Sequence, residues 1–306
     1  MIKKVLSGLL GTVVGLSIVA MDTHAQDLDL EAIVEQEAEK LETEPSLPNP
    51  FYTIWGHVLP TVRTLPARIL DFRVSHHFGK LTGGLATFWG LGYATDVQIS
   101  FNYGITERLT AGFGYYRGGW IASKNLDLRV KYWILNQVDG APFHLSVLLV
   151  SAWSAGSVNP FDFYGPPTPA TRFSFLTMPI LAYQTSKITL QLSPYYILNQ
   201  RVPIGHPGSF LGTGLTIRYL ITPILAFVIE GAYTFNPPYD AYVPMVAAGI
   251  TLLTGGHVFS VRFVNSRYLL ENYVLPYSTA SFKDIRFAFS FSRAFAFKKK
   301  DDSKQW

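Results

Sequence analysis

Two pairs of histidine and serine residues have the side-chain types needed for covalent catalysis. His144 is two positions from Ser146, and His257 is three positions from Ser260. A lipid hydrolase uses a serine nucleophile, a histidine base and an orienting polar group at the edge of the lipid. Both pairs lie near the short-turn ends of expected strands, where we interpret them as isolated polar residues. We therefore expect no catalytic residue, and we expect that the protein is not an enzyme.

The adjacent residues His76 and His77 carry imidazoles, which bind transition metals readily. Neighbouring residues of a strand point to opposite faces of the sheet, so these two imidazoles cannot bind one ion from the same side. The glycine-rich runs 82–84 and 254–256 lack the strand, loop and helix context of a phosphate site. The chain has no cysteine, which excludes disulfides and thiolate chemistry. We expect neither a bound metal nor a cofactor.

Charged residues alternate with apolar ones in several segments. In the segment 126–132, leucine, valine and tyrosine alternate with Asp127, Arg129 and Lys131. A period of two predicts a β-strand with two different faces. A face with charges at consecutive positions cannot lie in a dry core, because burial of unpaired charge is costly. We therefore predict a polar lumen, lined by the charged residues Asp71, Arg73, Asp127, Arg129, Lys131, Arg218, Glu230, Arg262 and Arg286.

The segment 284–297 carries the opposite kind of face. Phe287, Phe289 and Phe291 occupy every second position, with Ala288 and Ser290 between them. A soluble barrel buries its apolar face inward, whereas a transmembrane barrel presents that face to lipid. Aromatic residues make up 15% of the chain and crowd the expected strand ends, as in the aromatic girdles of membrane barrels. We predict that the three phenylalanines face lipid.

Twelve segments have the pattern of strands, although the alternation is weaker in the middle of the chain. Longer connections follow the odd strands and short turns follow the even ones, which is typical of an up-and-down antiparallel meander. With an even number of strands, both termini lie on one side of the membrane, and we expect the loops near 79–94, 154–170, 199–210 and 267–282 to face the other side. The expected strands are 68–75, 96–103, 108–116, 126–134, 143–153, 171–184, 187–198, 211–220, 224–234, 244–254, 257–265 and 283–297.

The hydropathy of the chain limits how it can cross a membrane. After residue 25 the sequence has no run of eighteen apolar residues, which is what a spanning helix requires. In lipid, only helices and closed barrels satisfy all of their backbone hydrogen bonds. The sequence therefore predicts an all-β fold: a transmembrane up-and-down antiparallel β-barrel of about twelve strands with a short acidic N-terminal arm.

The N-terminus has the three parts of an export signal. Lys3 and Lys4 precede an apolar run at residues 9–20, and the small residues Thr23 and Ala25 form a cleavage site. We predict that residues 1–25 are a signal peptide that is cleaved after Ala25. An uncleaved anchor helix is the alternative, although the apolar run is short for a span.

Charge is divided unevenly along the rest of the chain. The segment 26–50 has eight carboxylates against one lysine, a net charge of −7, and we interpret it as a periplasmic arm that is partly disordered or a short helix. Residues 51–306 have 22 basic and 12 acidic residues, a net charge of +10. We assign 51–297 to the barrel and 298–306 to a charged tail. The arm either lies at the mouth of the barrel or remains free of it.

Four segments carry a resemblance to a known family. Residues 69–79, 91–117, 254–266 and 284–295 resemble an uncharacterised family of Gram-negative outer-membrane β-barrel proteins, with the GGHVF turn and the DIRF strand start as the more specific parts. The resemblance spans about residues 51–297 and implies the fold and an outer-membrane location. The family has no established activity, so the resemblance assigns no functional residue.

Two functions remain as hypotheses. Basic residues outnumber acidic ones among the expected lumen positions, which favours a porin-like passive channel or transporter for small hydrophilic solutes, including anionic ones. The alternative is a non-conducting structural barrel that docks a partner through its loops or its acidic arm. The partners that we expect are outer-membrane lipid, a small solute and a periplasmic partner of the arm. Basic residues are spread along the chain rather than gathered on one helix, so we expect no nucleic-acid binding.

Overall fold

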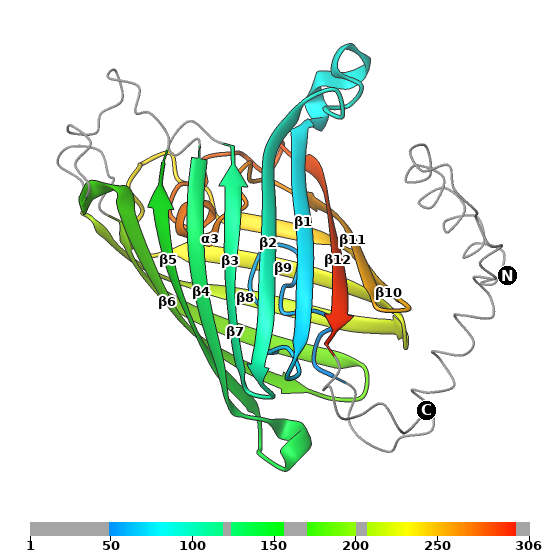
Figure 1. Cartoon of the computed structure of the whole chain (residues 1–306). Coiled ribbons are helices and arrows are strands. Elements are labelled where there is room, and N and C mark those ends of the chain that lie inside the picture. Colours follow the sequence, from blue (N-terminus) through cyan, green and yellow to red (C-terminus); the bar gives the residue numbers. More distant parts are fainter. Residues whose placement is uncertain (1–48, 119–123, 156–169, 200–206, 298–306) are drawn as a thin grey trace, which may run out of the picture.

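A computed structural model describes residues 49–118, 124–155, 170–199 and 207–297. The predicted signal peptide, residues 26–48 of the predicted arm and the tail 298–306 lie outside the described residues. Twelve antiparallel strands form one closed barrel in which each strand pairs with its neighbours in sequence and β1 pairs with β12 (Figure 1). The prediction of a twelve-stranded up-and-down barrel is therefore confirmed, and each expected strand overlaps an observed one.

The strands are eight to fourteen residues long, and the described connections between them contain four short helical turns. Their bounds are β1 Ile69–Lys80, β2 Ala94–Thr106, β3 Leu109–Arg117, β4 Lys124–Leu135, β5 His144–Ser154, β6 Phe173–Gln184, β7 Ile188–Asn199, β8 Ser209–Thr222, β9 Leu225–Thr234, β10 Met245–Thr254, β11 His257–Val264 and β12 Arg286–Ala296. The helical turns are η1 Leu81–Thr87, η2 Gln137–Asp139, η3 Ala170–Arg172 and α3 Glu271–Val274. None of the helices in the described part of the chain is long and apolar enough to cross a membrane.

The two ends of the barrel differ. We call the end at which β1 begins and β12 finishes the terminal end. Tight turns join the even strands to the odd ones there, except between β4 and β5, where the connection includes η2. At the other end, the loop end, the connections are longer and the β1–β2 hairpin projects beyond the barrel (Figure 1). Closure of β12 onto β1 pairs Val74 with Phe291 and His76 with Phe289, so the sheet has no unpaired edge.

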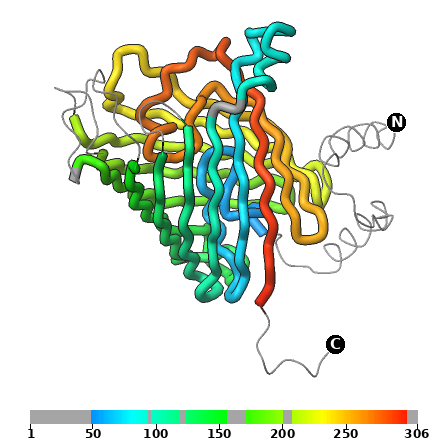
Figure 2. Tube along the Cα trace, turned by 45° about the horizontal axis from the view of Figure 1, so that its top comes forward, coloured from blue at the N-terminus to red at the C-terminus, as the bar shows by residue number. Residues whose placement is uncertain are grey.

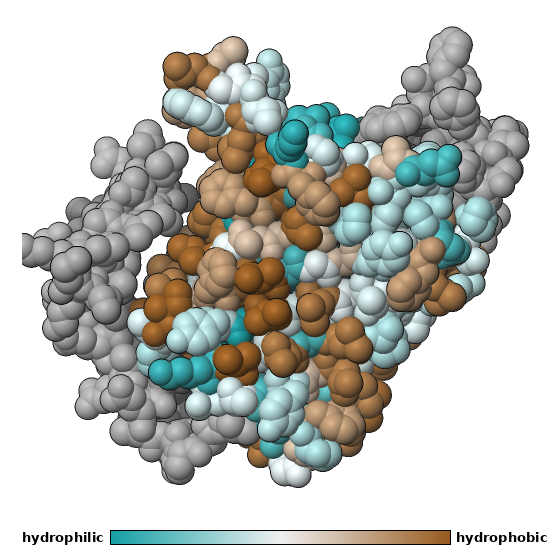
Figure 3. Space-filling model, turned by 180° about the vertical axis from the view of Figure 1, so that it is seen from behind, coloured by the Kyte–Doolittle hydropathy of each residue, from teal (hydrophilic) through white to brown (hydrophobic). Residues whose placement is uncertain are grey.

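Strand β4 shows the predicted alternation. Asp127, Arg129 and Lys131 point inward and are buried, whereas the leucine, valine and tyrosine side chains between them are 44 to 66% exposed on the outer surface. Such exposure of large apolar side chains is unfavourable in water and expected against lipid. Apolar side chains are spread over the outer surface of the barrel (Figure 3).

The inward face of the barrel wall is not polar all the way round. In β5 and β6 the inward residues include Leu148, Val150, Leu176, Met178 and Ile180, which are all buried. These two strands are apolar on both faces, which explains why their alternation is weak in the sequence. This part of the wall is therefore apolar on its inward face, unlike β4.

Two segments fold into the barrel and fill it. Residues 49–67, which we call the plug, enter from the terminal end, and residues 265–278, which we call the inner loop, enter from the loop end (Figures 1 and 2). The prediction that residues 267–282 form an outward-facing loop is therefore wrong for most of this segment, because nearly all of residues 265–278 are buried. Apolar residues of both segments join the apolar wall in one core, which covers surface that the wall would otherwise expose to the lumen.

The outer face of β12 provides a test of the membrane orientation. Phe289 lies in the middle of the strand and Phe295 lies on the same face near its end. Phe289→Arg places a cation deep in lipid and should lower the free energy of unfolding by about 2 to 4 kcal/mol, whereas Phe295→Arg should cost about 1 kcal/mol or less. Urea unfolding in lipid vesicles measures both; equal effects at the two positions would contradict the lipid-facing assignment.

Candidate functional site

The plug is anchored by a carboxylate on β9. The side chain of Glu230 accepts backbone hydrogen bonds from His57 at 2.8 Å, Val58 at 2.6 Å and Leu59 at 3.0 Å. These amides belong to a tight turn that is closed by the bond from the Thr61 amide to the Ile54 carbonyl, 3.0 Å. Consecutive backbone N–H groups that converge on one point form an anion-binding nest. The buried charge of Glu230 therefore has three strong partners, all from the plug.

Glycine at position 56 is required for this approach. A Cβ atom on Gly56 would lie 1.9 Å from Oε1 of Glu230, a distance that no packed structure tolerates. Gly214 on β8 similarly leaves room for the Leu59 side chain, whose Cδ1 would lie 2.7 Å from an added Cβ. The turn of the plug is thus in close contact with the walls on β8 and β9.

Lys131 holds the plug from β4, which lies nearly opposite β9 in the ring of strands. Its ammonium group donates to the carbonyl oxygens of Ile54 at 2.9 Å, Thr61 at 2.7 Å and Arg63 at 3.2 Å. An ammonium group has three donors, and here each has one carbonyl partner. On β7, the amide side chain of Gln191 accepts from the Val62 amide and donates to the Pro60 carbonyl, both at 2.9 Å.

An aromatic residue of the plug lies between two cations of the wall. The guanidinium carbons of Arg73 and Arg129 lie 4.8 Å and 4.5 Å from the ring centre of Trp55. Cation–π contacts of this kind contribute up to about 2 kcal/mol each when they are shielded from water. The indole therefore stabilises two buried charges on β1 and β4 without adding a charge of its own.

The inner loop is held by polar contacts of a similar kind. Glu271 accepts from Nη1 of Arg129 through both carboxylate oxygens, at 3.1 and 3.2 Å. Asn272 donates to the Ser174 hydroxyl at 2.8 Å, and the Tyr273 hydroxyl donates to the side chain of Asn125 at 3.0 Å. These contacts tie α3 to two strands of the wall, β4 and β6.

Arg129 contacts both inserted segments. Its guanidinium pairs with Asp127 of its own strand and with Glu271 of the inner loop, and it stacks on Trp55 of the plug. Its side chain is only 4% exposed, so both ion pairs are shielded from solvent. A buried charge that loses one partner is strongly destabilising. Displacement of either segment therefore weakens the site that holds the other.

His57 has an unusual environment within the plug. Burial, together with the positive charges of Arg262 and Arg73, lowers the pKa of its imidazole to about 3. Glu230, which faces the same turn, bonds to the backbone amide of His57. The inserted histidine is therefore neutral at neutral pH.

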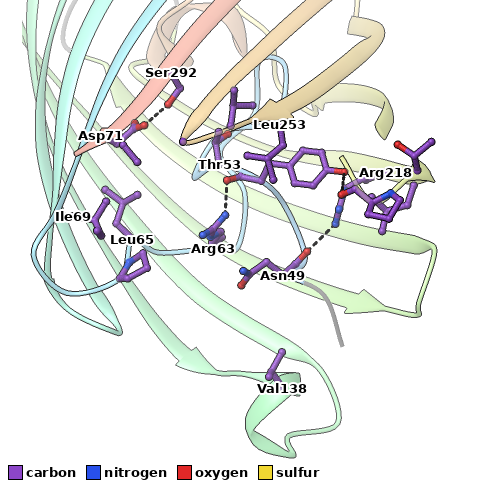
Figure 4. A pocket seen from close by; sticks show the side chains of 18 of the residues that line it. Asn49, Thr53, Arg63, Leu65, Ile69, Asp71, Val138, Arg218, Leu253 and Ser292 are labelled. Atoms are coloured by element: carbon purple, nitrogen blue, oxygen red, sulfur yellow. Dashed lines mark hydrogen bonds between the residues drawn. The ribbon is translucent and has the colours of Figure 1, made fainter. Parts of the chain in front are cut away.

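A cavity of about 750 Å³ occupies the mouth at the terminal end, between the plug and the wall (Figure 4). Arg63 of the plug and Arg218 of β8 both reach it, and so does Asp71 of β1. Asp71 accepts a hydrogen bond from the Ser292 hydroxyl and a weaker one from the amide of Asn102. Nη1 of Arg218 donates to the carbonyl of Asn49 at 2.9 Å.

The nine charged residues expected in the lumen are all buried inside the barrel. The structure brings Asp127 and Arg129 into one ion pair, and Lys131 and Glu230 form hydrogen bonds with the backbone of the plug. The others have separate partners: Arg73 and Arg262 contact Ser290, Arg218 and Asp71 reach the mouth cavity, and Arg286 donates to the Phe78 carbonyl. On the outer face of β12, the half-exposed phenylalanines are Phe287, Phe289 and Phe291.

Sequence reasoning missed the residues that complete this site. Trp55, His57 and Glu271 lie outside the strands, so no alternation marks them. One feature of the sequence could have indicated the plug. Residues 51–65 form an apolar stretch before the first strand that lacks the alternation of a strand. Such a stretch needs a surface to pack against, and the apolar inward faces of β5 and β6 supply part of it.

The geometry defines the class of the protein as a closed β-barrel with a lipid-facing exterior and a filled, charged interior. A family model described as a membrane-bound beta barrel domain, DUF5777, matches residues 51–295. The chain therefore belongs to this family of membrane-bound β-barrel domains. A search of curated proteins finds no significant match by sequence.

Solved structures with a similar fold include several porins and channels. The KdgM porin is 8% identical, with 75% of this chain and 99% of that chain covered and a TM-score of 0.45. The COG4313 outer membrane channel from Pseudomonas putida F1 is 13% identical, with 76% and 98% covered and a TM-score of 0.49. The NanC porin is 11% identical, with 75% and 100% covered and a TM-score of 0.43. At these identities the likeness concerns the fold alone.

Gly56 and Gly231 offer a matched test of the plug anchor. An added Cβ collides with Glu230 at position 56, but at position 231 its nearest neighbour is 3.7 Å away. The chain has no cysteine, so Val62→Cys gives a single buried reporter in the plug. We expect Gly56→Ala to raise the labelling rate of this cysteine by a water-soluble maleimide at least tenfold, and Gly231→Ala to leave it unchanged. Equal rates in the two variants would contradict the anchoring role of Glu230.

The low pKa of His57 predicts a pH dependence of the plug. A displaced His57 has an ordinary pKa of 6.5 and takes up a proton as the pH falls below that value, whereas the inserted imidazole stays neutral down to about pH 3. At pH 5 this difference disfavours insertion by about 2 kcal/mol. The ratio of labelling rates between His57 and His57→Gln chains, each carrying Val62→Cys, should rise from pH 7.5 to pH 5. A constant ratio would show that His57 does not titrate on release.

Proposed function

We propose that the protein is an outer-membrane channel for small hydrophilic solutes whose passage is closed in this state by the plug and the inner loop. The single observation that carries the proposal is the way in which the plug is held. Wall side chains bind its backbone through hydrogen bonds, as Glu230 and Lys131 do, and water can replace such bonds when the plug leaves. A displaced plug would leave a charged passage along β1 and β4.

The size of the barrel supports a passage. Eight strands leave an interior that side chains alone can fill, and sixteen leave an aqueous channel. Twelve strands lie between these limits, and this barrel needs two inserted segments to fill its interior. A location in the outer membrane agrees with the predicted signal peptide and with membership of a membrane-bound barrel family. Passive passage needs no catalytic group, so we propose a role other than an enzyme.

The filled interior favours a second candidate, a non-conducting barrel that docks a partner. Its inner loop and plug bury an apolar core together with the wall, which is the arrangement of a stable closed protein. In this case the loops or the N-terminal arm would carry the function. The two candidates differ in one measurable property, which is conductance after removal of the inserted segments.

Conductance of purified protein in planar bilayers tests the proposal. We expect the full chain to be closed for most of the time. Deletion of residues 51–65 should raise the conductance. Combining this deletion with Glu271→Gln should raise the conductance further, because the substitution frees the inner loop. Folding of each variant is checked by the heat-dependent change in its gel mobility. Folded deletion variants that stay as silent as the full chain would eliminate the channel and favour the docking barrel.

A further inference from the structure

The mouth cavity at the terminal end has an excess of positive charge. Among its described lining residues, Arg63, Lys187 and Arg218 are basic and only Asp71 is acidic. The carboxylate of Asp71 already accepts hydrogen bonds from Ser292 and Asn102. The cavity therefore presents cations whose charge the described lining does not balance.

The two arginines are fixed in place by backbone carbonyl groups of the plug. Nη1 of Arg63 donates to the carbonyls of Phe51 and Tyr52, and Nη1 of Arg218 donates to that of Asn49. In the part of the chain that the structure describes, neither guanidinium forms an ion pair. Arg218 is only 3% exposed, and its Nε has no hydrogen-bond partner among these residues. A buried guanidinium with unused donors is a ready receptor for an oxyanion.

The walls of the cavity indicate which kind of anion fits. Most of the remaining lining is apolar, with Leu220 of β8, Leu253 of β10 and Val258 of β11. The centre of the Tyr52 ring lies 4.7 Å from the guanidinium carbon of Arg218. A volume of about 750 Å³ is that of a small-molecule site. Apolar walls with a few convergent cations suit a ligand that has a carbon skeleton and acidic groups, and guanidinium groups match the planar geometry of carboxylates.

We propose that the mouth cavity is a binding site for carboxylates, recognised by Arg63 and Arg218 with Lys187 at its rim. The carboxylates come either from a small organic acid in solution or from the chain's own acidic segment 27–44, which precedes the plug in the sequence by four residues. Arg63 and Arg218 also hold the carbonyls at the start of the plug, so a bound carboxylate competes with these contacts and loosens the plug. The proposal rests on the proposed function, because the bound acid is taken to be a solute of the channel. Binding is measured without transport, so a failure of the binding proposal can be distinguished from a failure of the channel proposal.

The experiment is calorimetric titration of succinate into the full chain in detergent, with succinamide as the uncharged control and inorganic phosphate as the competing oxyanion. We expect succinate alone to bind. Arg218→Gln and Arg63→Gln should weaken binding at least tenfold, and Lys187→Gln, whose side chain has no contact with the plug among the described residues, about threefold. Arg293→Gln, on the outer face of β12, should leave binding unchanged.

A second arm uses the chain without residues 27–44 to distinguish the two sources of carboxylate. Tighter succinate binding after this deletion identifies the acidic segment as the competing occupant of the site, and unchanged binding identifies the free organic acid as the ligand. Absence of succinate binding in both chains would overturn the proposal. So would equal binding of phosphate, or binding that survives both Arg218→Gln and Lys187→Gln in folded protein.

Discussion

Charge enclosed within the barrel is the constraint on which the other features of this structure depend. An isolated ion in a protein interior costs several kcal/mol, and most of the wall charges face protein rather than bulk water. Backbone groups of the plug supply three N–H donors to Glu230 and three carbonyl acceptors to Lys131. Because these two residues lie on nearly opposite walls, they set both the depth and the orientation of the plug.

The lumen is divided into two kinds of wall, and the inserted segments match both. Charged residues gather on strands such as β1 and β4, whereas β5 and β6 present leucine, valine, methionine and isoleucine inward. The plug accordingly directs Trp55 toward the arginines and packs Leu59 and Val62 in the apolar core. One short segment thus satisfies charge on one side and buries apolar surface on the other, which makes its inserted position specific.

The plug and the inner loop depend on each other through Arg129. This residue stacks on Trp55 and pairs with Glu271, so each segment completes the environment that the guanidinium needs. Removal of one partner leaves a buried charge less well compensated, which favours departure of the other segment. We therefore expect insertion of the two segments to be cooperative.

The sequence by itself determined the strands, their number, the antiparallel order and the opposite characters of the two faces of β4. These features follow from the alternation of apolar and polar residues with a period of two, which is a local property of the sequence. Only the tertiary structure decided that residues 49–67 and 265–278 turn inward, and that Glu230 and Lys131 meet their backbone rather than water. Groups that meet inside the barrel are separated by up to about two hundred residues in sequence, and no local pattern encodes such pairing. The plug lacks regular secondary structure because its partners are wall side chains, so its fold exists only once the barrel has closed.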